Sequence, residues 1–258
     1  MTWDTVELET EDGITTITVD RPDRLNALNV ETLEALDEAL DEAAERDTRV
    51  LVVTGAGDDA FVAGADLAYM KDLGVQEAQA YSELGHRVMT KLETFPVPSI
   101  AAINGYAFGG GCELALAADM RVASERAIIG QVEISVGIIP GWGGIQRLAR
   151  LVNDEVARRL VYFGDRVDAE DADQHGLVGE VVAHDQLDNR VADLAEDIAT
   201  QPKYAMEAAK EAFTKVPRTH IDTGLDYEQR LWAALFDTAD QEEGMAAFVE
   251  DRDPEWEA

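Results

Sequence analysis

The feature that most constrains the fold is the order in which two hydrophobic patterns follow one another along the chain. Short apolar runs typical of strands alternate with amphipathic helical segments up to about residue 185, and only helical periodicity follows. Residues 50–53 (VLVV) form a continuous apolar run, which predicts a strand covered on both faces. Residues 30–46, preceded by a capping Asn29, and residues 75–93 carry apolar side chains at helical spacing. This order predicts an α/β domain that is closed by helices.

The remaining elements are shorter. Alternating residues on either side of Asp12-Gly13 predict a hairpin of two strands. Further strands are predicted at 100–103, 120–123 and 178–182, and further helices at 112–118, 153–163, 169–174, 205–215 and 224–236. No exact repeat or long linker separates the parts, so we expect one shared core. We divide the chain into a core over residues 1–195 and a C-terminal helical region over residues 196–258.

The charge of the chain excludes one class of function. The 258 residues include 53 acidic and 21 basic side chains, a formal net charge of -32, while a hydrophobic fraction of 46% suffices for a core. This charge excludes nucleic-acid binding through a basic face and argues against docking on anionic membranes. The cations comprise 5 Lys and 16 Arg. An acidic, Lys-poor surface fits a salt-loaded cytoplasm, where self-repulsion is screened, although an ordinary acidic protein of low salt remains the alternative.

Cysteine and hydropathy patterns narrow the setting. Cys112 is the single cysteine, which excludes disulfides within the chain and Cys-based zinc sites. The first residues are polar and acidic, and the weakly polar stretch 97–118 is broken by Asn104 and Glu113. We therefore expect neither a secretory signal nor a transmembrane helix, and a cytoplasmic location.

Two candidate motifs have simpler structural interpretations. Residues 55–60 (GAGDDA) match the dinucleotide fingerprint GxGxxA, but Gly64 interrupts the helix that should follow. Asp58 and Asp59 would also repel a pyrophosphate, so a loop that ends a strand is the better interpretation. The four histidines are scattered, which favours surface or capping roles over catalysis.

Two segments rich in small residues are more informative. Residues 61–67 (FVAGADL) permit close backbone approach, and Asp66 is placed to cap a following helix. Residues 104–114 (NGYAFGGGCEL) put three consecutive glycines between a buried strand and a helix. The backbone N–H groups there are unshielded and lie at a helix N-terminus, where negative charge is stabilised. A tight turn alone would rarely need three glycines.

Two glutamates lie near these segments. Taken alone, Glu113 is an exposed carboxylate in the first turn of a helix, and Glu133 is an ordinary strand-end glutamate. Apolar neighbours around Glu133, however, predict a raised pKa. Together with an anion site, the pair predicts acid–base chemistry at the carbons next to a carbonyl. Cys112 has no evident histidine partner, so helix packing is its expected role.

Six segments in order resemble the enoyl-CoA hydratase/isomerase (crotonase) superfamily from about Arg21 to Arg252. They are RPDRLNAL at 21–28, FVAGADL at 61–67, INGYAFGGGCELALAAD at 103–119, GQVEISVGIIPGWGGIQRL at 130–148, AEDADQHGLVGEVV at 169–182 and EEGMAAFVEDR at 242–252. The resemblance implies a right-handed spiral of ββα turns plus a C-terminal helical region that serves trimerisation and as a lid. It also implies a homotrimer or dimer of trimers, and a coenzyme A thioester as substrate in fatty-acid or short-chain acyl-CoA metabolism. No metal or redox cofactor is implied.

The resemblance assigns roles to particular residues. It implies an oxyanion hole of two backbone N–H groups, at Ala65 and Gly110, and two catalytic glutamates, Glu113 and Glu133. Family hydratases keep both glutamates, which implies reversible hydration of a 2-enoyl-CoA to a 3-hydroxyacyl-CoA. The implied substrate and coenzyme A contacts are Arg24, Ala63, Gly64, Asp66, Leu67, Ala68, Gly109, Val132, Gly141 and Trp142.

Alternatives stay open within and beyond this family. An isomerase of the family needs Glu133 but not Glu113, and a specialised short-chain 3-hydroxyacyl-CoA dehydratase of the same family is the other alternative. Some relatives bind RNA without catalysis, which the net charge of -32 argues against here.

The chain departs from the family pattern at several positions. Asp23 and Ala68 stand where the family often has Lys, so we expect coenzyme A affinity to depend on backbone contacts at 65–68 and on Arg24. Val132 replaces the usual Pro before the second glutamate, which predicts a slightly different placement of Glu133. Trp142 replaces a small residue and is expected to narrow the acyl pocket and favour short chains.

Overall fold

The chain begins with an antiparallel hairpin. The computed structural model describes residues 3–256. Strand β1 (Val6–Glu11) pairs with β2 (Ile14–Val19), and the turn between them places Asp12 and Gly13 at positive φ. Two successive residues with positive φ match the right-handed twist of paired strands, which is why Asp-Gly favours this turn. The predicted hairpin is confirmed.

The hairpin opens a six-stranded sheet in the order β1-β2-β3-β5-β7-β10. Strands β3 (Val50–Gly55), β5 (Ser99–Ile103), β7 (Met120–Ser124) and β10 (Glu180–Val182) all run parallel. Leu51 and Val53 of β3 face the main core, whereas Val50 and Val52 pack against helix α8 (Leu187–Ala199). Coverage of both faces explains the uninterrupted apolar run in β3, as predicted.

A second sheet of short strands was not predicted from the sequence. Its order is β4 (Ala60–Val62), β6 (Tyr106–Phe108), β8 (Ile128–Gly130) and β9 (Arg166–Asp168). Each turn of the chain gives one strand to each sheet and then a helix: β3, β4, α3; β5, β6, α4; β7, β8, α5. This repeated ββα unit agrees with the predicted architecture, and it stacks the loops after β4, β6 and β8 side by side.

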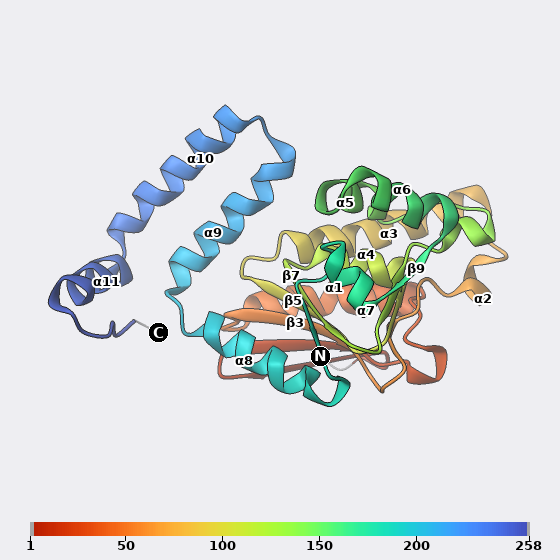
Figure 1. Cartoon of the computed structure of the whole chain (residues 1–258), viewed down its shortest axis with the longest axis horizontal. Helices are drawn as coiled ribbons and strands as arrows, with labels where there is room; N and C mark the ends of the chain where they lie inside the picture. The colour runs from red at the N-terminus through yellow and green to blue at the C-terminus, as the bar shows by residue number, and fades with distance from the viewer. Residues whose placement is uncertain (1–2, 257–258) are drawn as a thin grey trace.

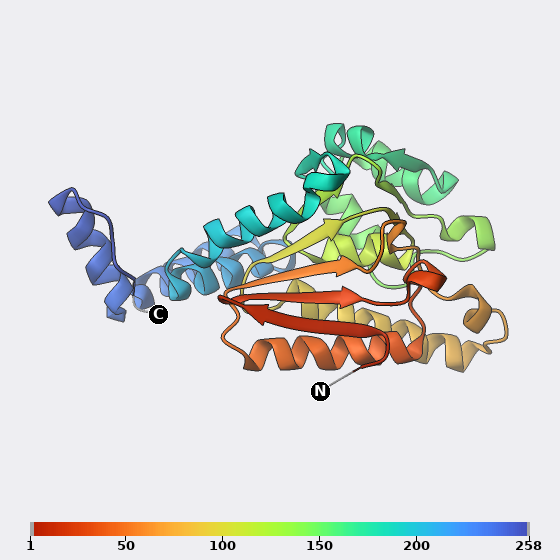
Figure 2. The ribbon, with the colours of Figure 1, turned by 90° about the horizontal axis from the view of Figure 1, so that it is seen from below.

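The helices confirm most of the predicted segments. Helix α1 (Val30–Glu45) is capped by Asn29, whose side-chain oxygen accepts a hydrogen bond from the Thr32 N–H at 2.9 Å. It packs with α3 (Val75–Glu93) in the main core, on the side of the large sheet away from α8 (Figure 2). The remaining helices before α8 are α2 (Leu67–Met70), α4 (Gly110–Ala117), α5 (Gly144–Leu151), α6 (Asp154–Phe163) and α7 (Ala169–Gln174), with 3-10 turns η1 (Pro22–Arg24), η2 (Glu133–Val136) and η3 (His184–Gln186).

Helices alone follow α8, as the sequence predicts. Helices α9 (Lys203–Lys215), α10 (Ile221–Ala234) and α11 (Ala239–Glu250), with short turns η4 (Val216–Arg218) and η5 (Leu235–Asp237), project away from the sheets (Figure 1). The expected boundary at residue 195 falls inside α8. This helix packs on the large sheet and is therefore part of the core. Buried Lys210 of α9 forms an ion pair with Asp119, which precedes β7, at 2.5 Å and so connects this region to the large sheet.

Within residues 3–256, no helix has the length and apolar character needed to cross a membrane.

Candidate active site

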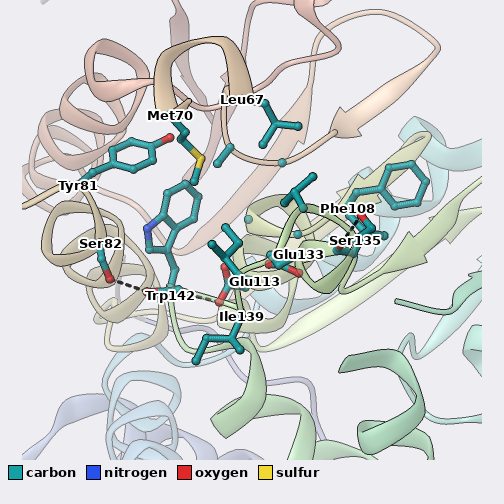
Figure 3. A pocket seen from close by; sticks show the side chains of 18 of the residues that line it. Leu67, Met70, Tyr81, Ser82, Phe108, Glu113, Glu133, Ser135, Ile139 and Trp142 are labelled. Carbon is teal, nitrogen blue, oxygen red and sulfur yellow. Dashed lines mark hydrogen bonds between the residues drawn. The ribbon is translucent and has the colours of Figure 1, made fainter. Parts of the chain in front are cut away.

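A cavity of about 530 Å³ lies where the loops after β4, β6 and β8 meet. Eleven of the fourteen predicted site residues line it: Ala63, Gly64, Ala65, Leu67, Gly109, Gly110, Glu113, Val132, Glu133, Gly141 and Trp142. Arg24 and Ala68 are exposed, and neither they nor Asp66 lines the cavity. Both glutamates line the cavity and lie close to each other (Figure 3).

The loop after β4 directs one backbone N–H away from its neighbours. Leu28 bridges this loop: its N–H donates to the Gly64 carbonyl and its carbonyl accepts from the Asp66 N–H, both at 2.8 Å. In a parallel bridge of this kind the residue between, Ala65, turns its own N–H to the opposite side. Ala65 therefore presents a backbone donor that the bridge does not use, beside the cavity that it lines.

Each of the three consecutive glycines meets a different requirement. Gly109 has φ 51°, and a Cβ there would lie 3.2 Å from Glu133 Oε1. A Cβ on Gly110 would lie 2.2 Å from the Trp142 ring, and one on Gly111 would lie 1.8 Å from the Val62 carbonyl oxygen. Gly110 is the first residue of α4, so its N–H has no acceptor within the helix. The run thus brings a free backbone donor, an indole ring and a carboxylate together, which explains why three glycines occur.

Glu113 is buried and firmly held. It is 1% exposed, and its Oε1 accepts hydrogen bonds from the N–H groups of Trp142 and Gly144, each at 2.7 Å (Figure 3). Burial, with a smaller contribution from the nearby Glu133, raises the pKa of Glu113 to about 7, although the hydrogen bond from Gly144 lowers it. The interpretation of Glu113 as an exposed carboxylate is wrong.

Glu133 faces the same cavity from η2. It is 9% exposed, and burial raises the pKa of its carboxyl to about 7, as its apolar neighbours predict. Gln131, which is fully buried, is oriented by its partners so that its amide nitrogen donates to both Glu133 oxygens, at 3.1 and 3.2 Å. Two carboxylates that share one low-dielectric site resist simultaneous ionisation, so the pair retains a proton near neutral pH.

Asp66 and Ala68 have local roles in this structure. The Asp66 Oδ1 accepts from the N–H groups of Ala68 and Tyr69 at 3.1 and 3.3 Å and so caps α2, as predicted. These two donors are already bonded. Arg21, rather than Arg24, lies against Asp66, at 3.3 Å.

Several lining residues were not singled out from the sequence. Tyr81 and Ser82 of α3 line the cavity, and the Ser82 hydroxyl donates to the Gly141 carbonyl at 2.8 Å. Arg166 of β9 is the one basic side chain among the described lining residues, and its guanidinium lies 4.8 Å from the Phe108 ring centre. The helical period placed Tyr81 on an apolar face but gave no sign of the cavity, and an isolated arginine in a polar stretch carries no pattern.

The alternative motifs have structural roles. The GxGxxA loop leads from β3 into β4 and not into a helix, and the Asn104 side chain fixes it by donating to the Gly55 and Gly57 carbonyls. None of the four histidines lines the cavity. Cys112 is buried, and its burial raises the pKa of the thiol to about 12, which agrees with a packing role.

Comparisons with known proteins agree with this geometry. Residues 9–258 match the family model described as enoyl-CoA hydratase/isomerase. A short-chain-enoyl-CoA hydratase of Clostridium acetobutylicum is 41% identical over 98% of this chain and 97% of its own length, and a crotonyl-CoA hydratase of Syntrophomonas wolfei is 40% identical with the same coverage. The crystal structure of an enoyl-CoA hydratase from Bacillus anthracis superposes with a TM-score of 0.94 at 37% identity, covering 98% of this chain and 99% of the other. With a match of this extent in both sequence and fold, the chain belongs to the enoyl-CoA hydratase/isomerase family.

Proposed function

We propose that the chain is an enoyl-CoA hydratase, which adds water reversibly to a 2-enoyl-CoA and gives a 3-hydroxyacyl-CoA. One observation carries the proposal: two buried carboxylates, Glu113 and Glu133, share a cavity with the backbone donors of Ala65 and Gly110. Hydro-lyase chemistry needs one group to accept a proton from water, another to donate one to carbon, and donors for the developing oxyanion.

The thioester oxygen would accept from the N–H groups of Ala65 and Gly110, which polarises the conjugated double bond. Glu113, as the carboxylate, takes a proton from the water whose oxygen bonds to C3. Glu133, as the acid, gives its proton to C2, so one water is consumed and the pair keeps one proton throughout. A pKa of about 7 on both groups suits proton transfer in either direction near neutral pH.

The two backbone hydrogen bonds to Glu113 favour hydration over isomerisation. They fix Oε1, and so orient the carboxylate that would hold the water. An isomerase shuttles a proton between carbons and needs only the second glutamate. Glu113→Gln keeps the acceptor for both N–H groups and removes the base.

The test compares hydration of crotonyl-CoA by the wild type, Glu113→Gln and Glu133→Gln, with exposed Glu9→Gln as the control. We expect each buried variant to lose about 10²–10⁴-fold in kcat, the range for removal of a general acid or base, and the control to be unaffected. Full hydration by Glu113→Gln would contradict the proposal. If the wild type fails to hydrate crotonyl-CoA while both it and Glu113→Gln move the double bond of a 3-enoyl-CoA, the isomerase is favoured.

We also propose that the chain forms a homotrimer or a dimer of trimers through residues 196–258. The support is the large apolar surface on the projecting helices, where Phe213, Trp232 and Phe248 are 72%, 62% and 88% exposed. Apolar patches of this kind are rarely left in water. Light scattering after size exclusion in molar KCl should give three or six chain masses, and a monomer mass would contradict the assembly.

A further inference from the structure

The indole ring of Trp142 lies between two helices at positions where both carry glycine. A Cβ on Gly85 of α3 would lie 2.2 Å from Trp142 Nε1, and one on Gly110 of α4 would lie 2.2 Å from Cζ3. The Tyr81 ring meets the indole edge-on, with centroids 5.3 Å apart and an interplanar angle of 77°. Trp142 is 4% exposed. The ring therefore fills a slot that exists because neither glycine has a side chain.

The backbone of the same residue is fixed as well. The Trp142 N–H donates to Glu113 at 2.7 Å, and the carbonyl of the preceding Gly141 accepts from the Ser82 hydroxyl at 2.8 Å. The indole consequently stands at a set position relative to the reacting carbons, with its benzo edge against Gly110. Figure 3 shows the ring as one wall of the cavity, beside Met70 and Tyr81.

We propose that Trp142, held in the slot at Gly85, sets the acyl length of the substrate and restricts it to short 2-enoyl chains of about the crotonyl size. This inference rests on the proposed hydratase function. The thioester oxygen is fixed near Gly110 and C3 near Glu113, so the chain beyond C3 meets the rigid indole. Extra methylenes have to displace a ring that close packing on α3 and α4 prevents from moving.

The geometry assigns a partner role to Gly85. It lies on the side of α3 that meets the ring and is itself no part of the cavity lining. A side chain there would push the indole toward the cavity and shorten the acyl space further. Gly85 is thus a positioning residue that acts through Trp142.

The experiment measures kcat/KM for 2-enoyl-CoAs of three, four, six, eight and ten carbons. Variants are Trp142→Ala, Trp142→Phe and Gly85→Ala, with Trp3→Phe, whose ring donates to Glu38 far from the cavity, as the control. The wild type and control should favour four carbons steeply, because a methylene that does not fit costs about tenfold or more. Trp142→Ala should raise the ratio of eight-carbon to four-carbon turnover at least about tenfold, Trp142→Phe less. Gly85→Ala should lower four-carbon turnover relative to the three-carbon substrate.

The proposal would be overturned if the wild type hydrated the ten-carbon substrate as well as the four-carbon one. It would also be overturned if Trp142→Phe, the variant that retains most of the packing, left the ratio of eight-carbon to four-carbon turnover unchanged. Calorimetric binding of the saturated butyryl- and octanoyl-CoA separates this proposal from the hydratase function. A preference for butyryl-CoA that Trp142→Phe weakens supports the role of Trp142 even if no chain is hydrated. Equal binding of both by every variant contradicts it even if hydration occurs.

Discussion

Replacing Glu113 by Gln should change how the stability of the protein depends on pH. Burial raises the pKa of Glu113 from 4.5 to about 7. Below pH 4.5 the carboxyl is neutral in both the folded and the unfolded chain. As the pH rises toward 7 the unfolded chain releases its proton first, and above 7 the folded protein carries a buried charge. The stability associated with the neutral carboxyl is therefore fully present below pH 4.5 and is lost as the pH rises through 7.

The magnitude follows from the same pKa change. At about 1.4 kcal/mol per pH unit, a change from 4.5 to about 7 amounts to roughly 3 kcal/mol. Most of this loss, roughly 2 kcal/mol, falls between pH 5 and pH 8. Glu113→Gln keeps an oxygen for the Trp142 and Gly144 N–H groups but does not ionise. From pH 5 to pH 8, the free energy of unfolding of the variant should therefore rise by roughly 2 kcal/mol relative to that of the wild type.

Thermal unfolding at fixed protein and salt concentration measures this difference. For a chain of this size, about 2 kcal/mol corresponds to a relative rise in Tm of about 4–8 °C from pH 5 to pH 8. The exposed Glu9→Gln should follow the wild type at both pH values. If Glu113→Gln and the wild type ran parallel across this range, the buried, proton-retaining pair would be refuted.

Four further outcomes are expected. The KM for crotonyl-CoA should fall from 0.1 to 2 M KCl, because a net charge of -32 repels the coenzyme A phosphates until salt screens it; a rise in a folded enzyme would contradict this. Arg166→Ala should raise that KM more than Arg24→Ala, since Arg166 lines the cavity and Arg24 does not; steady-state kinetics with both variants decide the order. Asp119→Ala should cost about 3 kcal/mol in urea unfolding, because it leaves the buried Lys210 without its carboxylate, and an unchanged midpoint would refute that role. Cys112 should react with a thiol reagent only after denaturation, because the thiol is buried; rapid labelling of the native enzyme would contradict its packing role.

The sequence predicted the long elements well because their patterns are local. The continuous apolar run at 50–53 is typical of a strand buried on both faces, as β3 is. An Asn at position 29, before a segment with helical period, predicts the start of a helix, as α1 shows. The strands of the second sheet have three residues each, too few to show a period. Their partners come from distant turns of the chain, so only the folded structure reveals them.

The candidate site, too, could be predicted from the sequence only in part. The glycine run and the two glutamates are visible in the sequence, but their proximity is not, because Glu113 and Glu133 come from successive ββα turns. Glu113 is buried, and the two N–H groups that donate to it belong to residues 142 and 144, about 30 residues away, so its own segment alone resembles a helix surface. Arg166 reaches the cavity only because β9 pairs with β8.

The central claim is that this cavity adds water to C3 of a 2-enoyl-CoA. The most direct measurement follows crotonyl-CoA in molar KCl made with ¹⁸O-labelled water, by the absorbance of the conjugated thioester and by the mass of the product. We predict rapid loss of absorbance and a 3-hydroxybutyryl-CoA that carries one ¹⁸O atom. An unchanged absorbance with folded protein, or a product isomeric with the substrate and free of ¹⁸O, would contradict the account.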